Sequence, residues 1–325
     1  MRAYVLRRLL LIIPTVFLVT LGVFFLTHLI PGDIIDAMQA QATDVELPRA
    51  ELERAMGLDA PLLTQYGRWM GFVPLRDGNF SGILQGNFGS SIWQKVSVLE
   101  LAAQRWPVTF ELTLMALITG LLISLPVGIY SALRQDTWGD YIGRSFAIAC
   151  IAVPYFWLGT MIIVFPAVWW GYMPPIRLTL FFEDPIGNLR MFMPPAVVMG
   201  MALSGMSMRM TRTMMLEVLR QDYIRTAWAK GLRERVVVIR HALKNALIPV
   251  ISIIGIQMPL LVGGSVIVEK IFMLPGMGRL IIDAVYLRDY TVVSGILLLF
   301  SVALVLINLM VDLSYAFLDP RIHYK

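Results

Sequence analysis

The stretch EVLRQDYIRTAWAKGLRERVVVIRHALKNALIP, residues 217–249, is the one long polar interruption in the second half of an otherwise apolar chain. From Arg209 to Lys244 the chain carries nine basic residues, against the acidic residues Glu217, Asp222 and Glu234. Apolar runs of membrane-spanning length flank this stretch on both sides. It must therefore lie outside the bilayer, and its charge indicates on which side.

Composition places the whole chain in the membrane. Hydrophobic residues make up 58% of its 325 residues, only 15% are charged, and the mean hydropathy is +0.71. Soluble domains are less apolar and carry more charge. The net charge of +5 lies largely in loops beside apolar runs, which is typical of membrane insertion and does not indicate nucleic-acid binding. A single cysteine, Cys150, rules out an internal disulfide framework and a thiolate metal site, and no cofactor is expected in this chain.

Six runs are long enough to cross the bilayer, and backbone groups in lipid must be satisfied within the segment, so all six are predicted to be helices. Their ranges are 9–30, 108–133, 142–170, 194–208, 246–268 and 292–317. The predicted fold is an all-α polytopic membrane protein with six transmembrane helices. The predicted parts are 1–30 (N-terminus and first span), 31–105 (an external loop that forms a cap) and 106–325 (a five-span core).

Basic residues in the short loops predict the orientation. They comprise Arg2, Arg7, Arg8, Arg134, Arg144, the Arg209–Lys244 cluster, Arg321 and Lys325, all on one face of a six-span chain. By the positive-inside rule this face is cytoplasmic, so both termini are predicted to be inside. The external loop then contains two short amphipathic helices, 47–58 ended by Gly57 and 62–69 with Asp59 as a candidate N-cap.

The acidic residues within the predicted spans are Glu111 and Asp312, and both lie near span ends, where a structural role is favoured. An ion-coupled transporter would need carboxylates near the bilayer midplane, and none is predicted there. The methionine-rich region 199–215 is interpreted as packing rather than as a substrate surface.

Two helical stripes are predicted within the polar stretch. The first is Ile224, Ala227, Trp228, Gly231 and Leu232; the second is Val238, Ile239, Ala242, Leu243, Ala246 and Leu247. Gly231 is expected to end the first helix, since glycine accepts positive φ and allows another backbone to approach closely. From composition alone the stretch could bind anionic lipid or a cytoplasmic partner.

The spacing Arg225-Thr226-Ala227-x3-Gly231-x9-His241-x-Leu243-Lys244 resembles the EAA loop of ABC importer permeases, E-A-A-x3-G-x9-I-x-L-P. The departures at Arg225, Thr226, His241 and Lys244 are shared by the peptide-type branch, which includes dipeptide, oligopeptide and nickel importers. The segment Glu269-x-Ile271-Phe272-x2-Pro275-Gly276-x-Gly278-Arg279 also resembles the region between the last two spans of that family. The resemblance covers nearly the whole chain and favours partner docking over lipid binding.

The resemblance implies a type I ABC importer permease in the prokaryotic inner membrane, acting beside a second, different permease chain. Two cytoplasmic ATPase subunits would bind ATP and Mg²⁺, and an extracytoplasmic binding protein would deliver substrate. The residues implied in ATPase coupling are Tyr223, Arg225, Thr226, Ala227, Lys230, Gly231, Leu232, Arg233, His241 and Leu243. The residues implied in an external gate are Glu269, Phe272, Pro275, Gly276 and Gly278. The chain has no G-x4-G-K-[ST] loop to hold ATP phosphates, so it is not expected to be an enzyme.

Two other functional classes fit the sequence less well. An intramembrane hydrolase is disfavoured because His28, His241 and His323 stand in no H-E-x-x-H motif and the chain has no G-x-S-x-G motif. A passive channel would need a re-entrant filter loop, and residues 272–289 have the length for one, but their spacing matches the importer family better. Within the importer reading the predicted substrate is a di- or oligopeptide, with nickel complexes, glutathione and opines left open.

Overall fold

The computed structural model describes residues 2–29, 35, 48–173, 175 and 177–318. Most of the chain between the first span and residue 48 lies outside the described residues. So do Arg321 and Lys325, which contribute to the predicted orientation. Regular structure in the described part is helical, apart from an isolated bridge between Ser90 and Ser97. The all-α prediction is confirmed.

The described residues form two compact units. The first unit contains 108–278 and 306–318; the second contains 2–29, 35, 48–107 and 279–305. The helices α5 (Val98–Leu133), α12 (Met277–Tyr286) and α13 (Tyr290–Leu318) each contribute residues to both units. The predicted division at residues 30 and 105 stays a prediction.

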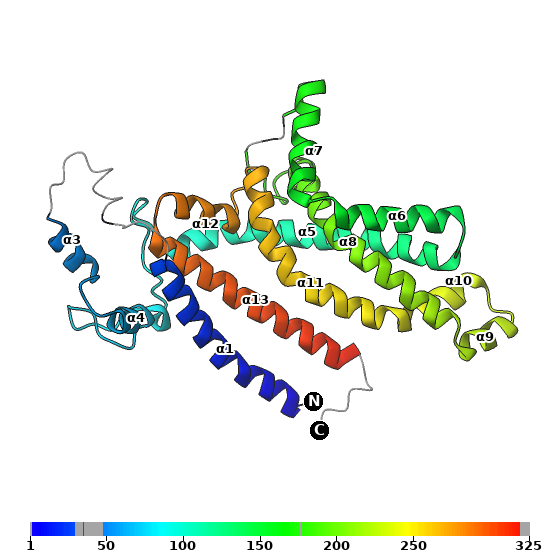
Figure 1. Ribbon diagram of the computed structural model, residues 1–325, viewed down its shortest axis with the longest axis horizontal. Coiled ribbons are helices and arrows are strands. Elements are labelled where there is room, and N and C mark those ends of the chain that lie inside the picture. The colour runs from blue at the N-terminus through cyan, green and yellow to red at the C-terminus, as the bar shows by residue number, and fades with distance from the viewer. Residues whose placement is uncertain (1, 30–34, 36–47, 174, 176, 319–325) are drawn as a thin grey trace. The chain divides into compact units, whose positions relative to one another are not determined.

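The first unit is a helical bundle (Figure 1). Its long helices are α5, α6 (Trp138–Ala152), α7 (Tyr155–Trp170), α8 (Pro185–Leu219) and α11 (Lys244–Ile271). Between α8 and α11 lie the short α9 (Asp222–Ala229), α10 (Glu234–Val236) and the π-helical turn η2 (Val237–Leu243). The apolar core of the bundle includes Leu112, Phe192, Val198 and Val268, all fully buried.

Helix α8 packs against its neighbours through glycines. A Cβ at Gly200 would lie 2.8 Å from the Ala116 carbonyl oxygen and 2.9 Å from the Gly120 nitrogen, both on α5. A Cβ at Gly205 would lie 2.8 Å from the Ala147 carbonyl oxygen on α6. Small residues let helix backbones approach this closely in membranes, where dispersion contacts replace the hydrophobic drive. The backbone of α8 therefore packs directly against the backbones of α5 and α6.

The second unit contains α1 (Arg2–Leu29), α3 (Arg49–Met56), α4 (Leu62–Met70) and the 3₁₀ turn η1 (Ile83–Gln85). Phe24 of α1 packs on Tyr66 of α4, and the Tyr66 hydroxyl lies 2.8 Å from Thr20 Oγ1. Asp289 joins the segment before α5 to the start of α13: Ser91 Oγ donates to its carboxylate at 2.6 Å, and the Ile92 backbone N–H donates at 3.1 Å.

Five helices are long and apolar enough to cross a membrane, and α6 with α7 makes a sixth if the bent pair counts as one span. The predicted third span, 142–170, was wrong as a continuous helix, because α6 and α7 meet at 95°. The cause is Pro154: the residue before a proline is disfavoured in the α region, and Val153 is extended at φ −80°, ψ 120°.

Other helix starts also differ from the sequence prediction. α5 begins at Val98 rather than 108, and α8 begins at Pro185 rather than 194, so Pro107 and the pair Pro194 and Pro195 lie inside helices. Gly57 ends α3 with φ +72°, as predicted. The prediction that Asp59 caps the next helix was wrong: Pro61 is the N-cap of α4, and the Asp59 carboxylate instead binds Arg76.

We expect Gly200→Val to lower the free energy of unfolding by about 1–3 kcal/mol, because the added atoms must push α5 and α8 apart. The measurement is thermal unfolding of the purified chain in detergent. Gly263→Val on α11 is the matched control, since no atom lies within 4 Å of a Cβ at that position. Equal stability of the two variants would contradict the close-packing account.

Candidate functional site

The basic segment, residues 217–249, is folded and lies at one end of the first unit (Figure 1). α8 ends at Leu219, α9 turns away from it, and the chain re-enters the bundle through α10, η2 and α11. Ile224 and Ala227 of α9 are buried and pack with Met215 of α8, Val237 of η2 and Ala132 of α5. The apolar side of the segment thus attaches it to α5 and α8.

The predicted stripes were partly right. Ile224, Ala227, Val238, Ala242 and Ala246 are buried, as a core-facing stripe requires, and the fully buried Val237 was not predicted. The sequence pattern also assigned Trp228, Leu232 and Ile239 to the stripes, but their side chains are 44%, 37% and 51% exposed. These apolar side chains point away from the core because α9 is only two turns long and η2 is π-helical, so neither keeps a straight α-helical face.

Gly231 ends α9 in the left-handed region, at φ +73°. The Leu232 N–H donates to the Ala227 carbonyl at 3.4 Å, and the Gly231 N–H donates to the Trp228 carbonyl at 2.9 Å. This pair of bonds is the Schellman motif, which favours glycine at its left-handed position. The positive φ was predicted; the close approach of another backbone was not found, since no atom lies within 4 Å of a Cβ built at Gly231.

The residues implied in ATPase coupling divide by exposure. Ala227 is buried and His241 and Leu243 are half-buried, so these three position the segment. The others are exposed: Tyr223, Arg225, Thr226, Lys230, Gly231, Leu232 and Arg233. Asn245 Nδ2 donates to the Tyr223 hydroxyl at 2.8 Å, which links α9 to α11. The exposed surface of the segment therefore mixes cations with aromatic and aliphatic side chains, a composition suited to protein docking.

A buried ion pair stabilises the first unit one turn before the basic segment. Arg212 of α8 donates to Asp140 of α6 through Nε and Nη2, each at 2.7 Å, and the Asp136 N–H donates to the same carboxylate at 3.1 Å. The Asp140 side chain is fully buried and that of Arg212 is 20% exposed. Sequence reasoning counted Arg212 only as one of the basic cluster and missed this pair, because the two residues are 72 positions apart.

The residues implied in an external gate do lie together, at the junction of α11 and α12. Glu269 is fully buried, and its Oε1 accepts from Thr109 Oγ1 of α5 at 2.7 Å. The same hydroxyl oxygen accepts from the Met277 N–H at 2.8 Å. Gly276 lies against the Glu269 carboxylate: a Cβ there would be 2.4 Å from it.

The other three residues implied in the gate also lie at this junction. Gly278 lies beside Val266, whose Cα would be 2.4 Å from an added Cβ. Phe272 is buried and Pro275 is half-buried. Thr109, which joins three elements, was missed in the sequence, because its hydroxyl has no pattern that distinguishes it from other threonines in the spans.

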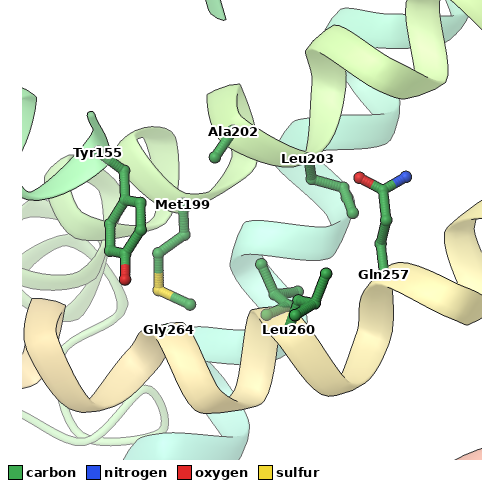
Figure 2. A pocket seen from close by; sticks show the side chains of 8 residues that line it. Tyr155, Met199, Ala202, Leu203, Gln257, Leu260 and Gly264 are labelled. Atoms are coloured by element: carbon green, nitrogen blue, oxygen red, sulfur yellow. The ribbon is translucent and has the colours of Figure 1, made fainter. Parts of the chain in front are cut away.

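A pocket of about 190 Å³ lies between α7, α8 and α11. Figure 2 shows Met199 reaching into it from α8, with Leu260 and Gln257 on α11 opposite and Tyr155 at one end. The walls are mostly apolar, and the Gln257 amide and Tyr155 hydroxyl are the polar groups among its lining side chains. The pocket therefore resembles an apolar packing defect between helices rather than a polar substrate site.

A protein-family profile described as "Binding-protein-dependent transport system inner membrane component" matches residues 124–324, and its N-terminal companion profile matches residues 1–113. The chain belongs to this family. It is a permease of a binding-protein-dependent ABC importer, a multi-pass protein of the inner membrane, and ATP hydrolysis belongs to separate ATPase subunits.

Curated relatives of the permease match over their full length. The glutathione transport system permease protein GsiC of Pectobacterium atrosepticum is 37% identical over 99% of each chain. The proteins of the same name from Salmonella typhimurium and Escherichia coli K12 are 38% and 37% identical, again over 99% of each chain.

Solved ABC transporters share the fold. The MetNI methionine transporter, in inward-facing conformations, aligns with a TM-score of 0.55 at 19% identity, over 68% of this permease and 97% of that chain. An amino acid ABC transporter crystallised with histidines aligns with a TM-score of 0.53 at 14% identity, over 67% of this permease and 94% of that chain. The expected type I importer permease fold is confirmed, while the cytoplasmic placement of both termini stays a prediction.

We expect Asp140→Ala to destabilise the permease by about 3–5 kcal/mol, because it leaves the largely buried Arg212 guanidinium without its counter-charge. The double variant Asp140→Ala/Arg212→Met removes both charges and should recover most of the loss. The unfolding free energies of the wild type, Asp140→Ala, Arg212→Met and the double variant, measured in detergent, give the coupling energy between the two side chains. A double variant as unstable as the sum of the single variants would contradict the ion pair's role.

Proposed function

We propose that the permease moves small peptides, including glutathione or close relatives of it, into the cytoplasm as one of two different permease chains. The observation that carries the substrate class is the 37–38% identity to glutathione permeases over 99% of each chain. Glutathione is itself a modified tripeptide. The peptide-type form of the basic segment, with Arg225, Thr226 and His241, supports the same class.

The basic segment is proposed as the docking surface for a cytoplasmic ATPase subunit. Its apolar side is fixed on α5 and α8, and its exposed surface includes Trp228 and Leu232 together with Arg225, Lys230 and Arg233. A surface attached to the bundle in this way can pass a movement of the ATPase subunit to α8 and α11. Coupling requires an element of this kind, whose conformational equilibrium is shifted both by the ATPase subunit and by the translocation pathway.

The junction of α11 and α12 is proposed as the external gate. Glu269, Thr109 and the Met277 N–H form one buried hydrogen-bonded set, and Gly276 and Gly278 allow the chain to turn against it without a side chain. Breaking one hydrogen bond of a buried polar network leaves an unsatisfied polar group, which is costly. The junction is therefore expected to move as a unit, with these hydrogen bonds intact.

The substrate proposal is tested by uptake. The permease is produced with the products of its neighbouring genes, the importer is reconstituted in proteoliposomes, and ATP-dependent uptake of radiolabelled glutathione is measured. We expect uptake that needs the binding protein and is inhibited by di- and tripeptides. Uptake that peptides leave unchanged, together with import of a nickel complex, would refute the peptide class while leaving the importer assignment intact.

The docking proposal predicts that Gly231→Leu lowers uptake about tenfold or more without preventing membrane insertion. A non-glycine residue at φ +73° costs about 1–2 kcal/mol and would reshape the turn that presents Leu232. Ala227→Asp is expected to act similarly, by placing a charge in the buried cluster that holds α9. ATPase subunits that co-purify with each variant are quantified by mass spectrometry.

Gly171→Leu is the matched control for the docking test. Gly171 ends α7 in the same left-handed region, at φ +62°, and a Cβ there also meets no atom within 4 Å. The control therefore carries a similar backbone penalty outside the basic segment. Normal uptake and normal ATPase recovery in Gly231→Leu, or equal losses in Gly171→Leu, would count against docking through this segment.

A further inference from the structure

A cavity of about 970 Å³ lies within the second unit, and its lining contains no residue of the basic segment or of the α11–α12 junction described above. Its lining comes from the end of α1, the C-terminal ends of α3 and α4, the loop from residue 75 to residue 89 and the first turn of α13. The volume falls in the range of pockets that hold small organic molecules, roughly 300–1,000 Å³. Nothing in the coupling mechanism requires a cavity here.

The charged residues of the lining are mostly basic. It contains the three arginines Arg54, Arg68 and Arg76 against the single carboxylate of Asp77. Arg76 is already engaged, because its guanidinium binds both oxygens of Asp59. Arg54 is exposed, and Arg68 is half-buried, so these two guanidinium groups are the ones that can receive an anion.

Helix stability explains part of this arrangement. Arg54 and Arg68 stand in the last turns of α3 and α4, where a cation compensates the negative end of the helix dipole. That role requires only a charge near the terminus. It does not account for the Arg68 Nε atom, which is buried and has no hydrogen-bond partner among the described residues. A buried donor without an acceptor costs about 1–3 kcal/mol, and a bound anion would remove this cost.

The cavity also offers the opposite charge and apolar surface. The Asn79 backbone N–H and side-chain amide donate to Asp77 at 3.1 and 3.0 Å, and these bonds hold the pKa of the Asp77 carboxyl below its usual value. Asp77 therefore stays ionised and can receive an ammonium group. Phe24, Trp69 and Phe88 supply aromatic walls. A zwitterionic ligand with excess negative charge matches these groups.

We propose that this cavity binds the carboxylates of a small anionic peptide, with Arg54 and Arg68 as the donors and Asp77 as the partner of its ammonium group. The inference rests on the proposed import of small peptides and adds a binding site on the permease itself. A guanidinium pairs with a carboxylate through two parallel hydrogen bonds, which gives both strength and orientation. A concave site of small-molecule size favours a peptide over the acidic surface of a protein, which would need a flatter and wider contact.

The test uses the complete importer in phosphatidylcholine nanodiscs without its binding protein, so that any bound peptide reports on the membrane subunits. Equilibrium binding of labelled glutathione is measured, with triglycine and triglycine amide as competitors. We expect triglycine to compete and its amide, which lacks the carboxylate, to compete much less well. Arg54→Gln and Arg68→Gln should each raise the Kd for glutathione about tenfold or more, the loss expected for a charge-assisted hydrogen bond.

Three controls make the result specific. Arg54→Gln removes an exposed group, so its effect cannot be ascribed to misfolding. Arg68→Lys keeps the charge but loses the paired donors and should give an intermediate Kd. Arg49→Gln removes a cation from the same helix α3 that does not line the cavity, and it should leave the Kd unchanged.

Three outcomes would overturn the proposal. One is an equal Kd in the wild type, Arg54→Gln and Arg68→Gln. A second is an unchanged Kd with weaker retention of the binding protein, which would make the basic lining a protein-docking surface. The third is peptide binding that is absent in phosphatidylcholine, while the two variants lose retention of phosphatidylglycerol, which would assign the cavity to a lipid headgroup. Each would leave the import proposal standing, because uptake is measured separately.

Discussion

Backbone-to-backbone packing along α8 is the constraint on which the first unit depends. Glycines at positions 200 and 205 bring α8 against α5 and α6, and seven residues beyond Gly205 the contact is completed by the Arg212–Asp140 pair. A helix held this closely cannot bend or slide without breaking several contacts together. The buried Met215, near its end, then supports Ile224 and Ala227 of α9. The exposed basic surface is thus attached to a helix whose backbone packs directly against two neighbouring helices.

The sequence predicted the features that periodicity and glycine chemistry control. Membrane-spanning runs, the all-α class and the left-handed Gly57 and Gly231 follow from local composition, because lipid forces hydrogen bonds to stay within a segment and glycine alone accepts positive φ cheaply. The family resemblance added the fold. Span boundaries were less predictable, because a proline is compatible both with a helix start and with a helix interior whose neighbours satisfy the freed carbonyl.

The site was predictable only where the contact partners are near in sequence. Gly231 and the exposed cations of α9 could be read from spacing, whereas Arg212 with Asp140 and Glu269 with Thr109 join residues 72 and 160 positions apart. One sequence does not show such pairs, since many polar residues could serve each partner. The exposure of Trp228 and Ile239 was missed for a geometric reason: the stripe was drawn on an ideal α-helix, and the chain here is a two-turn helix followed by a π-helical turn.

That π-helical turn, residues 237–243, is the place where the long helix formed by α10 and α11 can bend most easily. An α-helix is stiff along its axis because each N–H is bonded one turn back, and a π turn interrupts this ladder with a wider, less regular one. Interruptions of this kind are where helices bend. A load applied to α9 would therefore be taken up as rotation about residues 237–243 before it strained the membrane-embedded part of α11. The π-helical turn thus lies between the proposed docking surface and the fifth span, where it interrupts the α-helical hydrogen-bond ladder without a loop.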